Sequence, residues 1–321
     1  AYCRDHAVYI LTDVVDEDVE ILLQKLFTKK ITVFHNAKFD LAMLEYHFGF
    51  EFPRIEDTML MHYMLNENPG THGLKQLALK HTKYGNYEQE LHDYIADYCK
   101  RNGVLKTQFT WESIPFEVMQ VYAAMDAAVT FELYELMNEA LNKNPRLVKV
   151  YKNILMPGMV FLKDCQDNGV PFDRRRLEEA QELMEKDIQE AIDKLYSFKE
   201  VQMFETAQGK EFNPNSTVQL RSLLFDAIGL QPTGKKTGTG ANSTDAEVLG
   251  QLAEQHAVPN LILAIRQKSK IKNTYLDKII PQLDRDGRLR TNFNLHSTTS
   301  GRLSSSGKLN MQQIPRDNPI V

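Results

Sequence analysis

Two pairs of polar residues stand at a spacing that could support hydrolysis. Tyr122 and Asp126 are four positions apart in a segment with helical apolar periodicity, so the phenol and the carboxylate share one helical face. Asn36 and Asp40 repeat this spacing just after a β-rich run. Carboxylates that converge from two elements, with a phenol beside them, could hold Mg²⁺ and orient a water for attack on a phosphodiester. Taken alone, each pair is more often a helix cap or a solvated face.

A second group of polar residues lies around position 300. In LHSTTSGRLSSSGKLNMQQIPR (295–316), hydroxyls and glycine surround Arg302, and amides follow at Asn310, Gln312 and Gln313. Pyrimidine O2 and purine N3 accept hydrogen bonds at nearly the same place in the minor groove, so an arginine there would test base pairing without reading sequence. Composition alone would equally allow a serine-rich linker.

Basic residues gather in two further segments, although the whole chain carries a net charge of −5. Such elements could neutralise backbone phosphates and hold a duplex without reading its sequence. For the helical segment alone, an ordinary solvated face is an even alternative. The candidates are Arg266 and Lys270 on an expected helix over 264–280, and Lys235 and Lys236 in the loop GKKTGTGANST.

Length and composition indicate a globular protein of more than one domain. At 321 residues the chain exceeds what one hydrophobic core usually supports, so two or three domains are expected. Apolar content of 42% and charged content of 25% are ordinary for a globular chain. Apolar runs such as NLILAI are much shorter than the roughly 20 residues of a bilayer span, so no membrane partner is expected. Cys3, Cys99 and Cys165 have no metal-ligand spacing and suit a reducing compartment.

Strands and helices alternate in the first part of the chain. ITVFHNA (31–37) predicts a strand followed by a turn and a helix. Asp57 is well placed to cap a helix over 58–65, and HGLKQLALKH (72–81) has an amphipathic pattern. FEVMQVYAAMDAAVTFELYELMNEAL (116–141) predicts one long helix. This alternation favours an α/β domain over residues 1–148.

The pattern changes after residue 148. Pro157-Gly158 is expected to interrupt the helical pattern, and DNGVPFD (167–173) predicts a turn followed by a short extended piece. The charged segment RRRLEEAQELMEKDIQEAIDKLYSF then predicts a long amphipathic helix with opposite charges at i,i+3 and i,i+4. We therefore expect a mostly helical region after the α/β domain.

HNAKFD, IEDTMLMHYML and YAAMDAAVT occur in the order found in the 3′→5′ exonuclease domain of family A DNA polymerases, and this part of the chain resembles that domain. The resemblance implies a ribonuclease-H-like α/β fold. It also implies that Asp40 and Asp126 ligate metal, that Tyr122 positions the attacking water and that Asn36 lies near the bound strand.

The family's first exonuclease motif, an Asp-x-Glu on an opening strand, would lie well upstream of residue 1. Asp18-Val19-Glu20 has the right letters, but DEDVEILLQKLF predicts the acidic first turn of a helix, where negative charge complements the helix dipole. We therefore expect only half of the exonuclease constellation in this chain.

The later segments resemble the thumb and the start of the palm of the same family. FNPNSTVQL (212–220), with Asn215 and Ser216, the GKKTGTG loop and the basic helix are similar to the thumb. TTSGRLSSSGKLNMQQIPR is similar to the segment that runs from thumb into palm, with Ser300 and SGK as mild departures. The resemblance implies that Arg302 contacts the primer-terminal pair and that Gln312 and Gln313 contact the primer-template.

We therefore expect a fragment of a family A DNA polymerase. The fold class is an α/β ribonuclease-H-like exonuclease domain (1–148), then a mostly α-helical thumb (149–290) and the first palm segment (291–321). The implied cofactors are two Mg²⁺ per active site, with Mn²⁺ as an alternative. The implied partners are primer-template DNA and, in the complete enzyme, dNTPs, in the cytoplasm of a bacterium or a phage-infected host.

The family's polymerase carboxylates would follow residue 321, so the chain by itself is expected to lack polymerase activity. Two alternatives remain open. The chain could be one half of a split polymerase whose second chain supplies the remaining palm and the fingers. It could also be a non-catalytic duplex-DNA-binding module with an inactive exonuclease. The divergence of the motifs favours a phage-type relative.

Overall fold

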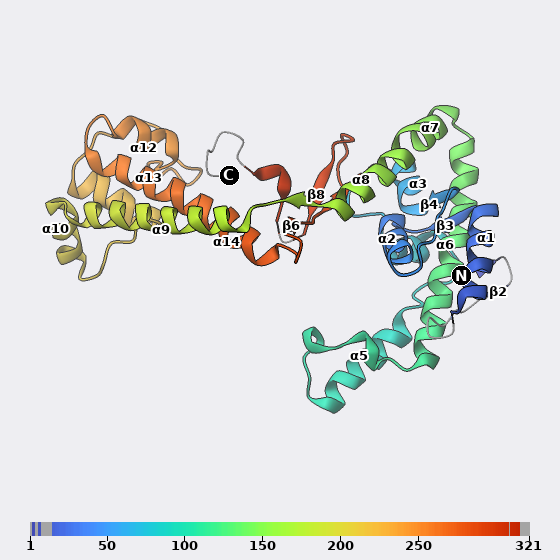
Figure 1. The fold of residues 1–321 in the computed structure, drawn as a ribbon. Helices are drawn as coiled ribbons and strands as arrows, with labels where there is room; N and C mark the ends of the chain where they lie inside the picture. The colour runs from blue at the N-terminus through green and yellow to red at the C-terminus, as the bar shows by residue number, and fades with distance from the viewer. Residues whose placement is uncertain (1, 4–5, 8–14, 308, 315–321) are drawn as a thin grey trace. The chain divides into compact units, whose positions relative to one another are not determined.

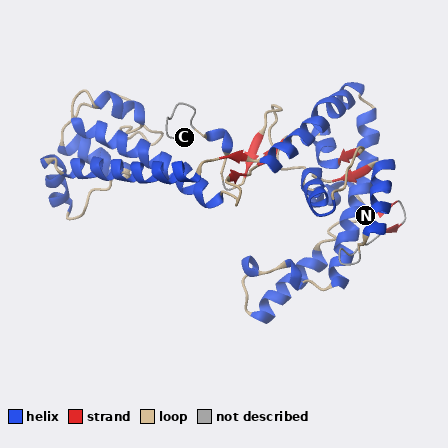
Figure 2. Ribbon diagram, in the orientation of Figure 1, coloured by secondary structure: helices blue, strands red, loops and turns tan. Residues whose placement is uncertain are grey.

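The computed structural model describes residues 2–3, 6–7, 15–307 and 309–314. Figure 1 traces the elements in chain order, and Figure 2 shows that helices outnumber strands in the described part. The contacts divide the chain into two compact units. Unit 1 comprises 1–168 and 292–306, and unit 2 comprises 169–291 and 307–321. Over the described residues, no helix is both long and apolar enough to cross a membrane.

The sheet of unit 1 is a parallel pair of strands joined through a helix. β3 (Thr32–Phe34) pairs with β4 (Ile55–Asp57), which places Phe34 opposite Asp57. α2 (Ala37–Phe48) makes the connection and ends at Gly49, whose φ of 64° is the left-handed conformation that glycine adopts readily. The predicted order of strand, turn and helix is confirmed.

The other elements of the first 120 residues surround this strand pair or extend from it. Asp16 caps α1, and the first turn of α1 is acidic, so the rejection of Asp18-Val19-Glu20 as a catalytic motif agrees with the structure. The elements are β1 (Tyr2–Cys3) antiparallel to β2 (His6–Ala7), α1 (Glu17–Lys29), α3 (Thr58–Leu65), α4 (Leu74–His81), α5 (Gln89–Asn102) and the 3₁₀ turns η2 (Lys106–Gln108) and η3 (Trp111–Ser113).

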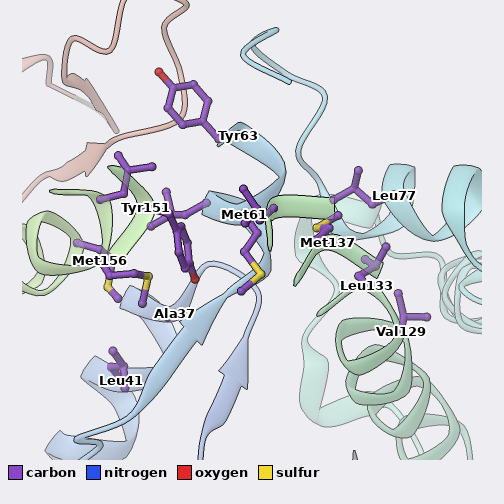
Figure 3. Close-up of a cluster of buried hydrophobic side chains, with 14 of the residues drawn as sticks. Ala37, Leu41, Met61, Tyr63, Leu77, Val129, Leu133, Met137, Tyr151 and Met156 are labelled. Atoms are coloured by element: carbon purple, nitrogen blue, oxygen red, sulfur yellow. The ribbon is translucent and has the colours of Figure 1, made fainter. Parts of the chain in front are cut away.

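A long helix and a continuous helical run complete the core of unit 1. α6 (Phe116–Asn142) is the single long helix that its unbroken apolar period predicted, and it packs against α3 and α4. Figure 3 shows side chains from α2, α3, α4, α6 and the 145–168 run meeting in one cluster. Its most buried members include Ala37, Met61, Leu77, Val129, Leu133 and Met159. The core thus fixes α2 and α6 relative to each other.

The run from 145 to 168 corrects one expectation. Pro157-Gly158 does not interrupt the helix, because both residues lie in α8 (Met156–Asn168). α7 (Pro145–Val150) continues into a π-helical turn, η4 (Tyr151–Leu155), immediately before α8. A π turn shifts the hydrogen-bond register, and Pro157, the second residue of α8, is tolerated as in a first helical turn.

Unit 1 also contains a hairpin from much later in the chain. β7 (Asn292–Asn294) pairs antiparallel with β8 (Ser304–Ser306). The amide of Phe293 donates to Gln166 Oε1 at 2.9 Å, and the Tyr63 hydroxyl donates to the carbonyl of Thr298 at 2.8 Å. Two polar contacts therefore attach the hairpin to α8 and α3.

Unit 2 is built on two long helices with two hydrophobic cores. α9 (Arg174–Tyr196) packs against α13 (Ala257–Ile271). One core gathers around Leu220, Leu249 and Ile262, and the other around Leu276 and Ile279. The remaining elements are β5 (Val170–Pro171) antiparallel to β6 (Arg288–Leu289), α10 (Lys199–Gln208), α11 (Thr217–Arg221), η5 (Ser222–Ala227), α12 (Ala246–Leu252), η6 (Lys272–Leu276), α14 (Asp277–Ile279), η7 (Ile280–Gln282) and η8 (Met311–Gln313).

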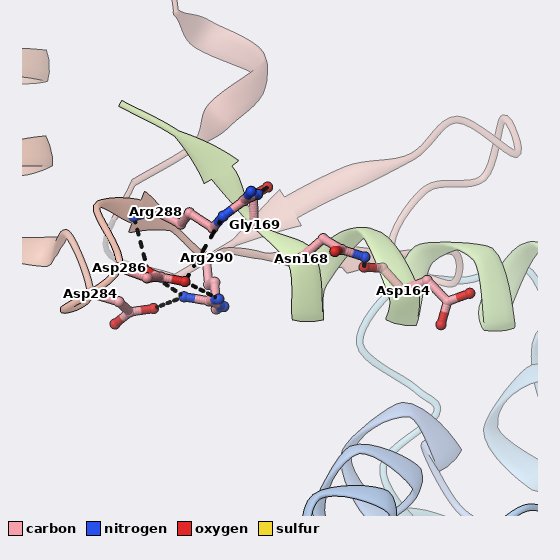
Figure 4. Close-up of polar contacts among 7 residues, drawn as sticks. All are labelled: Asp164, Asn168, Gly169, Asp284, Asp286, Arg288 and Arg290. Atoms are coloured by element: carbon pink, nitrogen blue, oxygen red, sulfur yellow. Dashed lines mark hydrogen bonds and ion pairs between the residues drawn. The ribbon is translucent and has the colours of Figure 1, made fainter. Parts of the chain in front are cut away.

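The β5–β6 pair depends on a glycine at its start. Gly169 has a φ of 61°, and a Cβ at this position would lie 2.9 Å from Arg290 Cγ and 3.0 Å from the carbonyl oxygen of Leu289. Arg290 cannot easily move away, because its guanidinium is held by Asp284 and Asp286 (Figure 4). Glycine is therefore required both by the backbone conformation and by the space.

Of the two long helices expected in this region, one has the predicted bounds more closely than the other. The charged helix is confirmed as α9. The basic helix expected over 264–280 begins earlier, at Ala257, where His256 caps it, and its last turns are η6 and α14. The predicted domain limits at 148 and 290 stay predictions. The two compact units meet in the sequence at 168/169, and residues 292–306 belong to unit 1.

Candidate functional site

A buried carboxylate at the end of β4 organises the candidate site of unit 1. Asp57 is 2% exposed and accepts hydrogen bonds from the amides of Asn36 (3.2 Å), Ala37 (2.9 Å), Met59 (2.8 Å) and Leu60 (3.3 Å). It therefore caps α3, as predicted, and also holds the start of α2, which was not predicted. Burial raises the pKa of the Asp57 carboxyl, against the effect of these four amides.

Asp57 constrains the turn that carries Asn36 and Asp40. Asn36 has a φ of 67°, the only positive value among the non-glycine residues that the structure describes. Asparagine tolerates this left-handed conformation better than most residues. Asp40 follows one turn into α2. Burial, and then the negative charges of Asp57 and Asp126, raise the pKa of Asp40 to about 6.

Asp126 is the centre of a polar and aromatic cluster on α6. Its carboxylate accepts hydrogen bonds from the ammonium of Lys75 and the phenol of Tyr87. The Lys75 ammonium also lies 4.3 Å from the ring centroid of Tyr122, 4.4 Å from that of Tyr87 and 3.5 Å from Glu88 Oε1. Lys75 thus contacts both Asp126 and Tyr122, the two residues that the four-residue spacing placed on one helical face.

Asp40 and Asp126 are the candidate metal ligands of unit 1. The pKa of Asp40 is raised first by burial and then by the nearby carboxylates, and a divalent cation beside it would favour the charged form. Among the described residues, however, no group of three or more His, Cys, Asp or Glu side chains is arranged to hold a metal ion. Carboxylate oxygens are ligands that Mg²⁺ prefers, and Mg²⁺ binding by Asp40 and Asp126 stays a prediction.

Sequence analysis missed Lys75 and Tyr87. Lys75 lies 51 positions before Asp126 and Tyr87 lies 39 positions before it, so no helical spacing links them. In the sequence, Lys75 stands near the start of an amphipathic helix, and this position predicts an ordinary solvated lysine. The sequence therefore gave no signal for its contact with Asp126. Only the packing of α4 and α5 beside α6 reveals their contact with the site.

Arg302 lies in the loop of the unit 1 hairpin. Its side chain is exposed, and its carbonyl accepts a 2.7 Å hydrogen bond from Thr298 Oγ1. Gly301 before it has a φ of 71° with open space around it. An exposed arginine beside a glycine agrees with the expected close approach to a duplex, and the contact itself stays a prediction.

The expected amide donors fall in unit 2. Asn310 caps η8 by accepting from the amide of Gln312 at 3.0 Å. The Gln312 side chain is exposed, and the Gln313 side chain lies outside the described part of the structure. The structure thus assigns Arg302 and these amides to different compact units.

Several basic residues of α13 and η6 bind groups of the protein itself. Lys268 forms an ion pair with Asp187, and Lys272 with Asp277. The Arg266 guanidinium donates to the carbonyls of Pro214 (3.0 Å) and Thr244 (3.0 Å).

Because most of its donors bind backbone carbonyls, Arg266 has a structural role. DNA binding at this position stays a prediction. Lys270 remains exposed.

Both lysines of the loop around residue 236 bind groups of the protein itself. Lys235 forms ion pairs with Asp245 (2.9 Å) and Glu247. Lys236 donates to Asn242 Oδ1 at 2.5 Å, and the two residues form a β-bridge.

In the preceding segment, Asn215 is exposed and Ser216 caps α11 by accepting from the amide of Gln219. DNA contacts by these four residues stay predictions.

Known protein families match both the first and the later part of the chain. Residues 177–320 match the family model of DNA polymerase family A, and residues 1–142 match that of the 3′-5′ exonuclease. The DNA polymerase of Escherichia phage T5 is 46% identical over the whole chain, which covers 40% of that protein. DNA polymerase I of Pseudomonas aeruginosa is 36% identical over 81% of this chain and 26% of its own length.

A solved structure is also similar. The POL domain of Pol1 from M. smegmatis, in complex with DNA primer-template and dNTP, superimposes with a TM-score of 0.71 and 26% identity. The match covers 97% of this chain and 48% of that one. The chain belongs to family A of the DNA polymerases and carries the exonuclease domain of that family. It spans less than half the length of these relatives.

Proposed function

We propose that unit 1 removes nucleotides from the 3′ end of DNA, with Asp40 and Asp126 as ligands of Mg²⁺. The observation that carries this proposal is the match of residues 1–142 to the family model of the 3′-5′ exonuclease, because this range includes Asp40 on α2 and Asp126 on α6. Bound Mg²⁺ would supply a Lewis acid and an activated water for hydrolysis of the phosphodiester.

The side chains around these carboxylates have supporting roles in the proposal. Lys75 restrains the Asp126 carboxylate and lies over the Tyr122 ring, so the phenol is held ready to orient a water. Asp57 binds the amides of Asn36 and Ala37 and so fixes the turn that precedes Asp40. Asn36 is exposed at this turn and is suited to contact the strand.

We further propose that the complete polymerase uses this chain to hold primer-template DNA during synthesis from dNTPs. The family membership supports this, as does the similarity to a POL domain solved with DNA primer-template and dNTP. The reaction is nucleotidyl transfer in which the primer 3′-OH attacks the α-phosphate, assisted by Mg²⁺. The proposed setting is the cytoplasm of a bacterium or an infected host.

The exonuclease proposal is tested with Asp126→Ala in the complete polymerase. We expect trimming of a 3′-labelled single strand in Mg²⁺ to fall by a factor of at least about 100, while primer extension is unchanged. Glu135→Ala is the control, because Glu135 is exposed on the same helix. Retained trimming by Asp126→Ala would remove Asp126 from the metal site.

The polymerase proposal is tested with Arg302→Ala. A minor-groove donor at the primer terminus acts on the alignment of the reacting end, whereas a phosphate clamp acts on binding. We therefore expect the rate of primer extension to fall much more than duplex affinity. Equal losses of both would show that Arg302 is an ordinary phosphate contact.

A further inference from the structure

The hairpin that carries Arg302 depends on its neighbours for its position. β7 and β8 are three residues each, and the loop between them spans residues 295–303. A two-stranded hairpin without further partners is only marginally stable in water. The side chains that attach this hairpin come from α2, α3 and α8, and all of them lie within unit 1. The place of Arg302 is therefore decided by the part of the chain that carries the exonuclease motifs.

β7 is held through both backbone polar groups of Phe293. The side-chain oxygen of Gln166, on α8, accepts hydrogen bonds from the Phe293 amide at 2.9 Å and from the Lys38 ammonium at 2.7 Å. The Lys38 ammonium, on α2, also donates to the carbonyl of Phe293. Since one residue on α2 and one on α8 bind this strand and each other, the first strand of the hairpin has a fixed place relative to these two helices.

Lys38 makes these contacts without a carboxylate partner. Its side chain is half-buried, and burial lowers the pKa of its ammonium against the effect of the Asp57 charge. Within the described residues, the hydrogen-bond acceptors of this ammonium are the neutral oxygens of Gln166 and Phe293. Neutral acceptors offset the desolvation of a charge less well than a carboxylate does. The contact with β7, rather than an ion pair, is therefore what this lysine contributes.

The loop is held close to Arg302 by Tyr63 of α3. The Tyr63 hydroxyl donates to the carbonyl of Thr298 at 2.8 Å, and Thr298 Oγ1 donates to the carbonyl of Arg302 at 2.7 Å. Tyr63 is 8% exposed and belongs to the hydrophobic core of unit 1, against which Leu295 of the loop also packs. One residue, Thr298, thus connects a core helix with the backbone of Arg302.

The Arg302 side chain has no such support. It is exposed, and its guanidinium forms no hydrogen bond or ion pair with the residues that the structure describes. The reach of the guanidinium is therefore set by the backbone of the loop. That backbone is restrained by Tyr63 at the loop, and by Gln166 and Lys38 at the strand before it.

We propose that Tyr63, Gln166 and Lys38 are positioning residues for primer extension. They fix the hairpin, and the hairpin presents Arg302 to the primer terminus. The inference rests on the proposed function of Arg302. It gives three side chains of the exonuclease part a role in synthesis that is separate from the trimming of DNA.

The test measures primer extension by the complete polymerase with Tyr63→Phe and with Gln166→Met. The first variant removes one hydroxyl and keeps the ring, and the second removes the acceptor that α8 offers to β7. A small displacement of an aligning group reduces the rate of reaction more than it reduces binding. We therefore expect extension at saturating dNTP to fall at least about fivefold in each variant, with duplex affinity changed by less than about twofold.

Two further variants and one structural measurement separate positioning from a general loss of packing. Tyr94→Phe is the matched control, since the Tyr94 hydroxyl also donates to a backbone carbonyl of unit 1, that of Ser113, at 2.8 Å. It should leave extension unchanged. Gln166→Glu keeps an acceptor oxygen and should restore most of the rate that Gln166→Met loses.

Hydrogen exchange of peptides over residues 292–306 follows the hairpin directly. Exchange should be faster than in wild type for Tyr63→Phe and for Gln166→Met, while exchange in α6 stays unchanged. Unchanged exchange of the hairpin in both variants would overturn the proposal.

A double-mutant cycle shows whether the effect passes through Arg302. In the Arg302→Ala background, Tyr63→Phe and Gln166→Met should reduce extension no further. Losses that multiply independently would overturn the proposal, as would normal extension by both variants when Arg302→Ala is slow. Normal extension by Arg302→Ala itself would instead refute the proposed function of Arg302, on which the inference rests.

Discussion

The ammonium of Lys75 is ion-paired with the carboxylate of Asp126, across 51 positions of sequence. Lys75 is 29% exposed and Asp126 is 32% exposed as side chains. A lysine in this place offsets part of the negative charge that would otherwise attract a divalent cation. The pair therefore links the position of α4 to the metal affinity of the proposed site.

Replacing this lysine should strengthen metal binding. In Lys75→Met, removal of one positive charge from a partly exposed pair should raise Mn²⁺ affinity by about fivefold, equivalent to about 1 kcal/mol. Trp111, the only tryptophan of the chain, has its ring centroid 6.4 Å from that of Tyr122, so its fluorescence can follow the titration. Lys80→Met is the control, being exposed on the same helix. Unchanged or weaker affinity in Lys75→Met would contradict this role.

The stability of unit 1 should depend on pH through Asp40. The pKa of Asp40 is raised from 3.8 to about 6 in the folded protein, so the folded state binds this proton more tightly than the unfolded state. Ionisation therefore destabilises the fold progressively as the pH rises from about 4 to about 6, with the full effect above that range. The effect is at most about 3 kcal/mol.

Asp40→Asn should remove this dependence. Its gain in unfolding free energy over wild type should be small near pH 4 and reach its maximum above pH 6, in urea titrations followed by Trp111 fluorescence in EDTA. Glu67→Gln, at an exposed position, should show no such trend. A constant difference across the range would show that Asp40 ionises normally.

Removing the Asp57 carboxylate should destabilise unit 1 strongly. Asp57→Ala leaves four amides without their acceptor, and each buried unsatisfied group costs about 1 to 3 kcal/mol. We expect a loss of at least about 3 kcal/mol in the unfolding transition that Trp111 reports. Asp16→Ala removes an exposed cap with one amide contact and should cost only about 1 kcal/mol. Similar losses in the two variants would show that the Asp57 network is weak.

Two glycines with nearly the same backbone conformation should differ in their tolerance of alanine. Gly169 and Gly209 have φ values of 61° and 64°, but only Gly169 has atoms close to the position of a Cβ. Both substitutions incur about 1 kcal/mol of backbone strain, and Gly169→Ala adds overpacking of about 1 to 3 kcal/mol. Thermal unfolding followed by circular dichroism compares them. Equal effects would mean that the β5–β6 pair readily adjusts.

Much of the local structure could be predicted because local rules operate there. The apolar period of 116–141 predicted α6, and the acidic start of α1 was distinguished from a catalytic motif by its helix-capping pattern. The motifs that resemble family A polymerases led to the family that the comparisons show. Pro157-Gly158 misled the prediction, since a preceding π turn accommodates a proline inside a longer helical run.

The sequence by itself determined the family, the order of the elements and the pairing of Tyr122 with Asp126, because these depend on short motifs and on helical periodicity. Only the tertiary structure decided which distant residues meet them. It placed Lys75 and Tyr87 on Asp126, gave Asp57 four amides to bind, and directed the Arg266 guanidinium to backbone carbonyls. Such contacts follow from how α4, α5 and α6 pack or how loops close, and no spacing rule along the chain encodes them.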